Sequence, residues 1–414
     1  MVKVVADLHM HSHYSRATSP GMELETLSKW AKIKGIDLLG TGDFSHPEWY
    51  KEIEKKAIES DSGFLQYNGV NFVLSNEVSC IYTQGGHGRR MHIVILSPSL
   101  EIVAQINEQL GKRGNVKSDG RPIFGMSAIE MAEIVLSVSD KNLVIPAHAW
   151  TPWFSVFGSM SGFDSLKEAF GEYEKSIYAI ETGLSSDPAM NWRLSSLDRL
   201  QLLSNSDSHS PEKIGREANV FDLDQFKYDD LYEAIRYKEK KKLVCTYEFY
   251  PEEGKYHFDG HRNCNVSMAP EETKKHNGIC PVCHKPVTVG VLNRVEQLAD
   301  RQDGFVPKNA VPYESLVPLK EVLGEAMGKA AASKAVDAEY FQLIKAFGNE
   351  FAVLHAPHEK LKKVAGERIA EAVKRVEGGK VKKVAGYDGE YGHIIIFGEK
   401  EKEREVGQKT LDDF

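Results

Sequence analysis

The chain has 414 residues, a formal net charge of −8 at pH 7, and 41% hydrophobic and 27% charged residues. This composition is typical of a soluble globular protein, and the length predicts one large domain with smaller additions. The acidic balance excludes a protein that binds nucleic acid over its whole surface, so any such surface must be local. We find no bilayer-spanning apolar run and no signal peptide, and we therefore expect a cytoplasmic protein with no membrane partner.

From the N-terminus to about Cys245, short apolar runs alternate with helical patterns. This rhythm predicts βα repeats, a mainly parallel sheet and an α/β fold, and the number of strands favours a (β/α) barrel. We expect strands at residues 2–6, 36–41, 70–75, 92–96, 143–147, 177–180 and 200–205. We expect helices between them at residues 24–34, 102–110, 128–136 and 228–238.

Potential metal ligands gather at the ends of these strands. The densest group is Asp7-Leu8-His9-Met10-His11-Ser12-His13, directly after the first strand. Further candidates at strand ends are Asp43, Glu77, His148, Glu181, Asp207 and His209. In (β/α) barrels the active site is built from the carboxyl ends of successive strands, so this distribution predicts a multinuclear metal site. His92 opens its strand and fits this rule less well.

These motifs resemble the PHP (polymerase and histidinol phosphatase) phosphoesterase family, a distorted seven-stranded (β/α) barrel with two or three metals. The resemblance implies that the ligands are His9, His11, Glu77, His92, His148, Asp207 and His209, with Asp207, His9 and Glu77 catalytic. The ions would be Zn, Mg or Mn. Where the family usually has Thr-Asp-His, this chain has Thr41-Gly42-Asp43, so either Asp43 or His46 completes the site.

Asp7 and His13, which also belong to the first cluster, are not expected to bind metal directly. We expect Asp7 to orient a ligand histidine, as metal-bound imidazoles commonly require. His13 is left outside the ring of ligands, because the ring is nearly filled without it.

A second metal motif follows the barrel region. His261-x2-Cys264 is separated by 15 residues from Cys280-x2-Cys283, which is the spacing of a zinc ribbon with two knuckles. Five cysteines, three of them here, argue for a metal site in a reducing compartment and against a disulfide framework. The motif predicts one structural zinc, with His257, His276 and His284 as rivals to His261 for the fourth position.

The rest of the chain reads as helices at residues 289–301, 319–327, 339–346 and 367–377, then a strand at 392–397. We expect a barrel at 1–245, a zinc module with its following helix at 246–310, a helical DNA-binding region at 311–398 and a flexible tail at 399–414. Lysine runs at 238–242, 360–363 and 380–383 are either local nucleic-acid patches or solvated faces. No phosphate-binding GxxxxGK[ST] loop is present, so no nucleotide is expected.

The tail ends in Gln408-Lys409-Thr410-Leu411-Asp412-Asp413-Phe414. The pattern of Gln408, Leu411 and Phe414 resembles the peptide box that docks on sliding clamps such as PCNA. The chain stops at Phe414, whereas that box usually has a second aromatic residue.

A multinuclear site of His, Asp and Glu suits hydrolysis at phosphorus, because it activates water and stabilises both the attacking and the leaving oxygen. The sequence lacks His-Glu-x-x-His and a Gly-x-Ser-x-Gly elbow, which argues against peptide and acyl hydrolysis. Phosphoester hydrolysis is therefore the predicted chemistry.

The parts of the chain follow one another in a set order: the barrel, the His-x-x-Cys…Cys-Pro-x-Cys finger, the segment Gly-Val-Leu-x-Arg-Val-Glu-x-Leu-Ala-Asp-Arg and the helical end. In this order of parts the chain resembles the endonuclease Q family over essentially its whole length. That resemblance implies a repair endonuclease that cuts double-stranded DNA 5′ to uracil, hypoxanthine, xanthine and abasic sites. It would leave 3′-hydroxyl and 5′-phosphate ends. The alternatives are a PHP-type phosphatase of a small phosphomonoester and a barrel kept as a non-catalytic scaffold.

A deaminated base must leave the helical stack to be read, and aromatic side chains commonly form the wedge or the pocket walls. We expect such residues among the aromatics of the loops over the barrel: Phe44, Trp49, Trp150, Trp153, Phe154 and Trp192.

Overall fold

A computed structural model describes residues 1–398 and 401. Its main sheet contains β1 (Val2–Asp7), β2 (Leu38–Gly40), β3 (Ile58–Glu59), β4 (Leu65–Tyr67), β5 (Val70–Gln84), β6 (His87–Ser97), β7 (Ile123–Phe124), β8 (Leu143–Pro146), β11 (Ala218–Leu223), β12 (Leu243–Phe249) and β15 (Tyr313–Leu316). The strands run in the order β15-β12-β11-β1-β2-β5-β4-β3, with β6 and β7 joined to β5, and β8 joined to β6.

The sheet is mixed, so the expectation of a mainly parallel sheet is wrong. β1, β2 and β5 are parallel neighbours, but β6 runs antiparallel to both β5 and β8. β5 and β6 form one long hairpin whose two-residue turn is Gly85-Gly86, with φ of +61° and +79°. Such a turn requires φ above zero at both positions, which glycine adopts without steric cost.

All seven strands predicted from the sequence are present, but the hydrogen-bonded ring of a closed barrel is not formed among residues 1–398. β9 (Ala179–Glu181) and β10 (Gln201–Leu203) form a separate parallel pair. Side chains bridge the gap between this pair and the main sheet. Asn205 accepts the backbone N–H of Leu8 at 2.9 Å, and Asn219 accepts that of Ser204 at 3.0 Å.

One apolar core is shared by all seven predicted strands and β11. Their alternate side chains point inward, as the two-residue period of a strand requires. The core includes Val4, Ala6, Leu38, Val73, Val94, Leu96, Leu143, Ile145, Ala179, Leu203 and Phe221. Helix α7 (Tyr228–Arg236) adds Tyr228, Leu231 and Ile235 to it.

Helices and 3-10 turns connect the strands of the first 240 residues, and several begin at a serine that caps them. Ser127 accepts the N–H of Glu130, whose carboxylate returns to the Ser127 N–H in a capping box. These elements are α1 (Leu24–Lys34), α2 (Pro47–Lys56), α3 (Leu100–Gly111), α4 (Ala128–Val138), α5 (Leu166–Phe170), η1 (Gly171–Ser176), α6 (Pro188–Asn191), η2 (Ser195–Leu197), η3 (Pro211–Lys213) and η4 (Lys238–Lys240).

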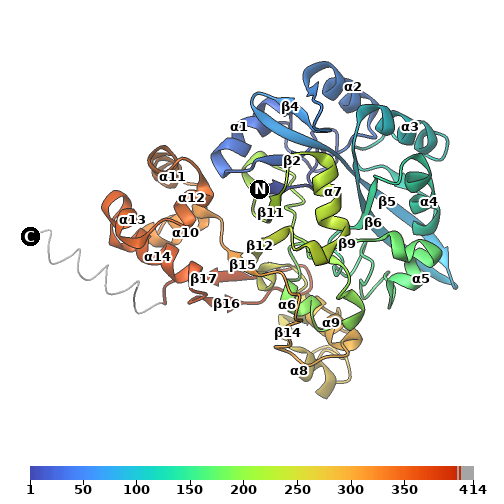
Figure 1. Ribbon diagram of the computed structural model, residues 1–414. Coiled ribbons are helices and arrows are strands. Elements are labelled where there is room, and N and C mark those ends of the chain that lie inside the picture. Colours follow the sequence, from blue (N-terminus) through green and yellow to red (C-terminus); the bar gives the residue numbers. More distant parts are fainter. Residues whose placement is uncertain (399–400, 402–414) are drawn as a thin grey trace, which may run out of the picture.

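The later part of the chain forms two further groups of elements (Figure 1). The first comprises η5 (Pro251–Glu253), β13 (Asp259–His261), η6 (Arg262–Cys264), β14 (Val266–Met268), α8 (Pro270–Lys275) and α9 (Val291–Leu298). The second comprises α10 (Leu319–Met327), α11 (Lys334–Phe347), α12 (Glu350–Leu354), α13 (His358–Ala365), α14 (Glu367–Glu377), β16 (Lys382–Val384) and β17 (His393–Ile395). The helices predicted at 319–327 and 367–377 coincide with α10 and α14.

Candidate metal centre

Two groups of ligand atoms meet at one end of the strands. His9, His11, Glu77 and Asp207 form the first, and Glu77, His92 and His148 form the second. Within each group the ligand atoms lie within 4.8 Å of one another. Glu77 belongs to both groups, so one carboxylate contributes donor atoms to both.

The two oxygens of Glu77 face different histidines. Its Oε1 lies 2.9 Å from His92 Nδ1 and 3.2 Å from His148 Nε2. Its Oε2 lies 3.2 Å from His11 Nε2. The carboxylate is fully buried at the middle of β5, at a position where the side chain points into the interior.

His9 shows that the first group suits a cation. Its Nδ1 lies 3.0 Å from Glu181 Oε2, while its buried Nε2 has no hydrogen-bond partner among the described residues. A buried polar atom without a partner is costly, and a metal ion would satisfy it. The carboxylate on the other ring nitrogen fixes the ring and its tautomer, as carboxylates behind metal-bound histidines commonly do.

His92 reaches the site because its strand runs backwards. It lies in β6, which is antiparallel to β5, and it pairs with Ser79. The amino-terminal half of β6 therefore lies at the same edge of the sheet as the carboxyl ends of the parallel strands. This explains why His92 did not fit a rule that assumes parallel strands.

Three of the predicted site residues lie in the left-handed region of backbone conformation. Asp43, His148 and Asp207 have φ of +49°, +28° and +45°. Non-glycine residues adopt such angles at a cost of about 1–3 kcal/mol, and they cluster at functional sites. Each sits where a strand gives way to a loop, and the turn aims its side chain at the site.

Asp43 was predicted as a metal ligand, but the structure places it behind His11 and outside both ligand groups. Its Oδ1 lies 3.0 Å from His11 Nδ1, and its Oδ2 accepts the Ser12 N–H at 2.6 Å and the Ser15 hydroxyl at 2.8 Å. Both oxygens are therefore occupied. His46, the alternative, occupies the N-cap position of α2 without a side-chain capping hydrogen bond and stacks on Tyr14 at 4.2 Å between ring centroids.

Asp7, His13 and His209 lie near the centre without joining either ligand group. Asp7 accepts the N–H groups of Ser206 and Gly215 at 3.0 and 2.9 Å, so it holds the loop that carries Asp207 and does not orient a histidine. His13 packs on Tyr14. The His209 ring lies 4.5 Å from that of His11, with Nδ1 3.0 Å from the Asp207 carbonyl oxygen.

The ligand side chains of the centre set one another's charge. Burial acts to raise the pKa of Glu77, but facing His92 and Arg121 outweigh it and hold that pKa well below its usual range. Burial acts to lower the pKa of His9, but Glu181 and Glu77 hold it well above its usual range. Burial lowers the pKa of His92 to about 4, which leaves this imidazole neutral and able to ligate.

Two more residues complete the surroundings of the ligands: Glu181, a strand-end candidate that the family resemblance left out of the ligand set, and Arg121, which the sequence did not single out. Glu181 contacts His9, accepts the His148 N–H at 3.1 Å and is itself held by Asn205 at 2.8 Å. Arg121 donates from Nη1 to Glu77 Oε2 at 2.9 Å. Glu181 could be identified from the sequence, because it stands at the end of a strand as the ligands do. Arg121 could not, because no sequence motif marks the loop that contains it.

The aromatic residues that we expected to contact a lesion base differ in how far they are buried. Phe44, Trp49 and Trp150 are fully buried in the core and cannot meet a base. Phe154 is partly exposed, and its ring centroid lies 4.8 Å from that of His92. Trp153 and Trp192 are also partly exposed, but they pack against the tyrosines Tyr256 and Tyr313.

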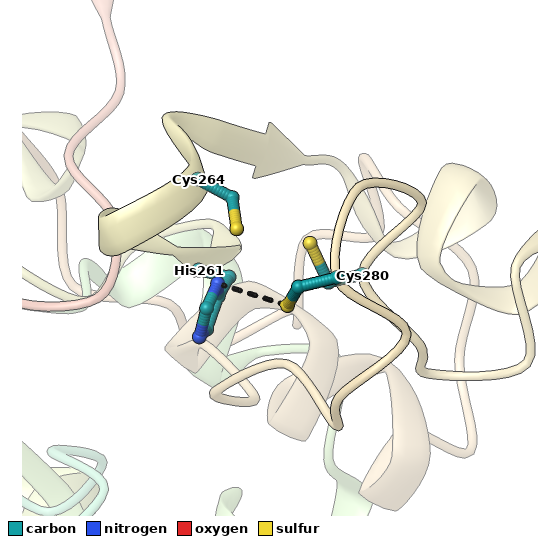
Figure 2. Close-up of side chains that lie close together, drawn as sticks. His261, Cys264 and Cys280 are labelled. Carbon is teal, nitrogen blue, oxygen red and sulfur yellow. Dashed lines mark hydrogen bonds between the residues drawn. The ribbon is translucent and has the colours of Figure 1, made fainter.

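A third ligand group lies in the segment after the main sheet. One atom each of His261, Cys264, Cys280 and Cys283 lies within 4.8 Å of the others. Figure 2 shows the labelled side chains pointing toward one another, and Cys283 Sγ lies 3.6 Å from His261 Nδ1. The rivals of His261 do not reach this group: His257 is buried against Phe258, and His276 and His284 are exposed.

The predicted clamp-binding residues Gln408, Leu411 and Phe414 lie outside the described residues. Among residues 1–398 and 401, the helices are all too short or too polar to cross a membrane.

Comparison with known families gives two partial matches. Residues 192–239 match the family described as PHP-associated, and residues 318–380 match the MJ0043 C-terminal domain. The chain is 31% identical over 410 residues to uncharacterized protein YqxK of Bacillus subtilis (strain 168), covering 95% of this chain and 100% of YqxK. It is 36% identical over 252 residues to uncharacterized protein MJ0043 of Methanocaldococcus jannaschii, covering 60% of this chain and 31% of MJ0043.

Two solved structures resemble the chain over nearly its whole length. The lesion-specific endonuclease PfuEndoQ from Pyrococcus furiosus is 33% identical with a TM-score of 0.86, covering 97% of both chains. Endonuclease Q in complex with a 27-mer duplex bearing an abasic lesion at the active site is also 33% identical with a TM-score of 0.86, covering 96% of this chain and 98% of the other. The fold is thus an α/β fold of the PHP type, and the chain belongs to the endonuclease Q family.

Proposed function

We propose that this protein is a metal-dependent DNA repair endonuclease that hydrolyses the phosphodiester 5′ to a deaminated base or an abasic site. The substrates are double-stranded DNA with uracil, hypoxanthine, xanthine or an abasic site, and the products carry 3′-hydroxyl and 5′-phosphate ends. The observation that carries the proposal is the position of Glu77 between two groups of ligand atoms. The similarity to an endonuclease Q bound to abasic-site duplex supports the substrate.

The metal centre uses His9, His11, Glu77 and Asp207 for one ion, and Glu77, His92 and His148 for a second. Divalent zinc, magnesium or manganese there supplies Lewis-acid stabilisation of the charge at phosphorus and lowers the pKa of water. Asp207, His9 and Glu77 are the residues on which this chemistry depends most directly. His209 is the candidate for a further ion, because it lies beside His11 and Asp207.

The chain's own residues hold the ligands in position. Glu181 and Asp43 each accept from the Nδ1 side of a ligand histidine, which leaves Nε2 of His9 and His11 directed at the centre. These contacts are buried, so solvent does not compete for the Nδ1 hydrogen bonds of the two histidines. Phe154, beside His92, is the aromatic residue best placed to contact the lesion nucleotide.

The test is a nicking assay with duplex DNA that contains one deoxyuridine, one deoxyinosine, one deoxyxanthosine or one abasic site, in the presence of Mg²⁺, Mn²⁺ or Zn²⁺. A nick on the 5′ side of the lesion, with a ligatable 3′-hydroxyl and 5′-phosphate, is expected. Undamaged duplex and p-nitrophenyl phosphate are the controls. Turnover of the phosphomonoester without nicking would favour a small-molecule phosphatase instead.

His261, Cys264, Cys280 and Cys283 are proposed to bind one structural zinc ion. The geometry of four converging ligand atoms from two knuckles supports this site. Purified protein is expected to retain one zinc ion per chain after the ions of the catalytic centre have been exchanged for magnesium. Zinc that leaves together with the catalytic ions would contradict a separate structural site.

Residues Gln408, Leu411 and Phe414 are proposed to dock on a sliding clamp of the PCNA type. Support comes from the sequence pattern alone. Deletion of residues 408–414 is expected to abolish clamp binding in a pull-down and to leave the nicking of free DNA unchanged. Clamp binding that survives the deletion would place the contact elsewhere.

A further inference from the structure

A permanent cation lies within the proposed metal centre. The Arg121 guanidinium donates from Nη1 to Glu77 Oε2 at 2.9 Å, and its side chain is 28% exposed, whereas Glu77 is fully buried. Arg121 also interacts electrostatically with Asp207, His92 and His209. Arg121 therefore connects the buried Glu77 to the solvent-exposed part of the site, where Asp207 and His209 are also partly exposed.

The loop that carries Arg121 is fixed on both sides. Asp119 accepts the Arg121 N–H at 3.1 Å, and the Pro122 carbonyl accepts the Ser79 N–H at 2.9 Å. Gly120 donates its N–H to the Tyr14 carbonyl at 3.0 Å. A Cβ atom at Gly120 would overlap the Asp43 carboxylate, so only glycine allows this close approach. The backbone of this loop is thus held in place by buried contacts, and it fixes the position from which the Arg121 side chain starts.

Most of the donors of Arg121 remain available. A guanidinium has five N–H donors in a planar fork. Within the described part of the chain, this guanidinium makes one hydrogen bond, to Glu77. If the residue only balanced the charge of Glu77, it would not need exposure to solvent. A fork with free donors beside hydrolytic ligands matches the non-bridging oxygens of a phosphodiester.

We propose that Arg121 binds the phosphodiester that is cleaved, through the non-bridging oxygens of its phosphate. This inference rests on the proposed nuclease function. In the hydrolysis the oxygen of water bonds to phosphorus, the bond from phosphorus to O3′ breaks, and O3′ takes up a proton. Arg121 forms and breaks no bond in this step. It places the phosphate against the metal centre and stabilises the charge that builds on the phosphate oxygens.

A competing explanation is that Arg121 only holds Glu77 in position for the metals. Three variants separate the two: R121Q removes the charge, R121K keeps the charge without the fork, and R16Q is the matched control. Arg16 is 76% exposed and pairs with Asp119 at 3.3 Å, so R16Q disturbs the same loop from the outside. Metal content is measured for each variant by mass spectrometry of the purified protein.

DNA affinity is measured in a D207N background, so that the duplex stays intact. The duplex carries one abasic-site analogue, and the phosphate to be cleaved is either normal or an uncharged methylphosphonate. R121Q is expected to bind the normal duplex roughly tenfold more weakly, R16Q within about twofold, and R121K in between. With the methylphosphonate, the proteins with and without R121Q are expected to bind alike, since the charge that Arg121 recognises is absent.

Cleavage by R121Q without D207N is expected to fall roughly 10²-fold in kcat with unchanged metal content. An equal loss of affinity on normal and methylphosphonate DNA, or a loss of metal ions that accounts for the loss of activity, would overturn the inference in favour of the Glu77 role. If the wild type nicks lesion DNA but R121Q binds and cuts as well as the wild type, only the inference fails. If the wild type nicks no lesion, the proposed function fails and the inference fails with it.

Discussion

The proposed metal centre and the proposed zinc site are assembled in different ways. His11 and Asp207, which meet at 3.1 Å, are 196 positions apart in the chain. His261 and Cys283, at the two ends of the zinc motif, are 22 positions apart. All the ligands of a local motif can be identified from their spacing in the sequence. A centre built from distant strands also depends on residues that only the fold brings near. The following variants test this difference.

The largest effect is expected for D207N. The change removes a partly exposed negative charge beside His9 and His11, and we expect nicking to fall by about 10³-fold or more. Single-turnover cleavage of a deoxyuridine duplex measures this, and D229N on the exposed start of α7 is the control. The zinc content of the His261 group is expected to stay the same. Loss of that zinc in D207N would show that the two sites are not independent.

C280S is expected to have the next largest effect, confined to the other region. Cys280 is the fully buried member of its ligand group, and structural zinc sites contribute directly to folding energy. We expect the loss of one zinc per chain and faster proteolysis within residues 259–290. C245S, a cysteine of β12 outside the group, is the control. Unchanged zinc content in C280S would refute the zinc site.

E181Q tests the surroundings of the metal centre. Glu181 accepts from His9 Nδ1 at 3.0 Å, and glutamine keeps its shape but removes the charge that makes His9 a stronger ligand. We expect the affinity for Mn²⁺ to fall by roughly 10- to 100-fold, measured by calorimetric titration. E108Q on exposed α3 is the control. An affinity equal to that of the wild type would mean that Glu181 does not tune the centre.

D43N is expected to have the smallest effect. Asparagine can still accept from His11 Nδ1, and the hydroxyl groups of Ser12 and Ser15 can rotate to suit the amide, so the main loss is the hydrogen bond that the Ser12 N–H donates to Oδ2. We expect a decrease of about tenfold or less in Mn²⁺ affinity and no change in the number of ions bound. The loss of a whole ion per chain would restore Asp43 to the ligand role predicted from the sequence.

The sequence predicted seven strands that the structure contains, because buried β-branched runs between helical patterns are a local signal, but it did not predict β11 and β12 of the main sheet. It missed the direction of β6, although Gly85-Gly86 is a recognisable hairpin turn. It placed Asp43 among the ligands because a carboxylate after a strand can ligate or can orient a ligand, and only its contacts with His11 and Ser12 separate the two roles. Arg121 could not be found, because its position depends on the packing of Gly120 against Asp43, and these two residues lie far apart in the sequence.

The separation of the ligands along the chain also sets an order of events during synthesis. The zinc ligands leave the ribosome within a short stretch, so this site can load as soon as residue 283 has emerged and needs only a small loop to close. The metal centre needs residue 207 to fold back onto residue 11. The entropy of closing this long loop is lost before the contacts that stabilise it can form. Ion uptake by the group of His9, His11, Glu77 and Asp207 therefore reports that the first 210 residues have reached their native arrangement. A pulse-labelled chain halted before residue 200 would bind no bridged pair of ions, whereas a peptide of residues 255–290 would take up zinc by itself.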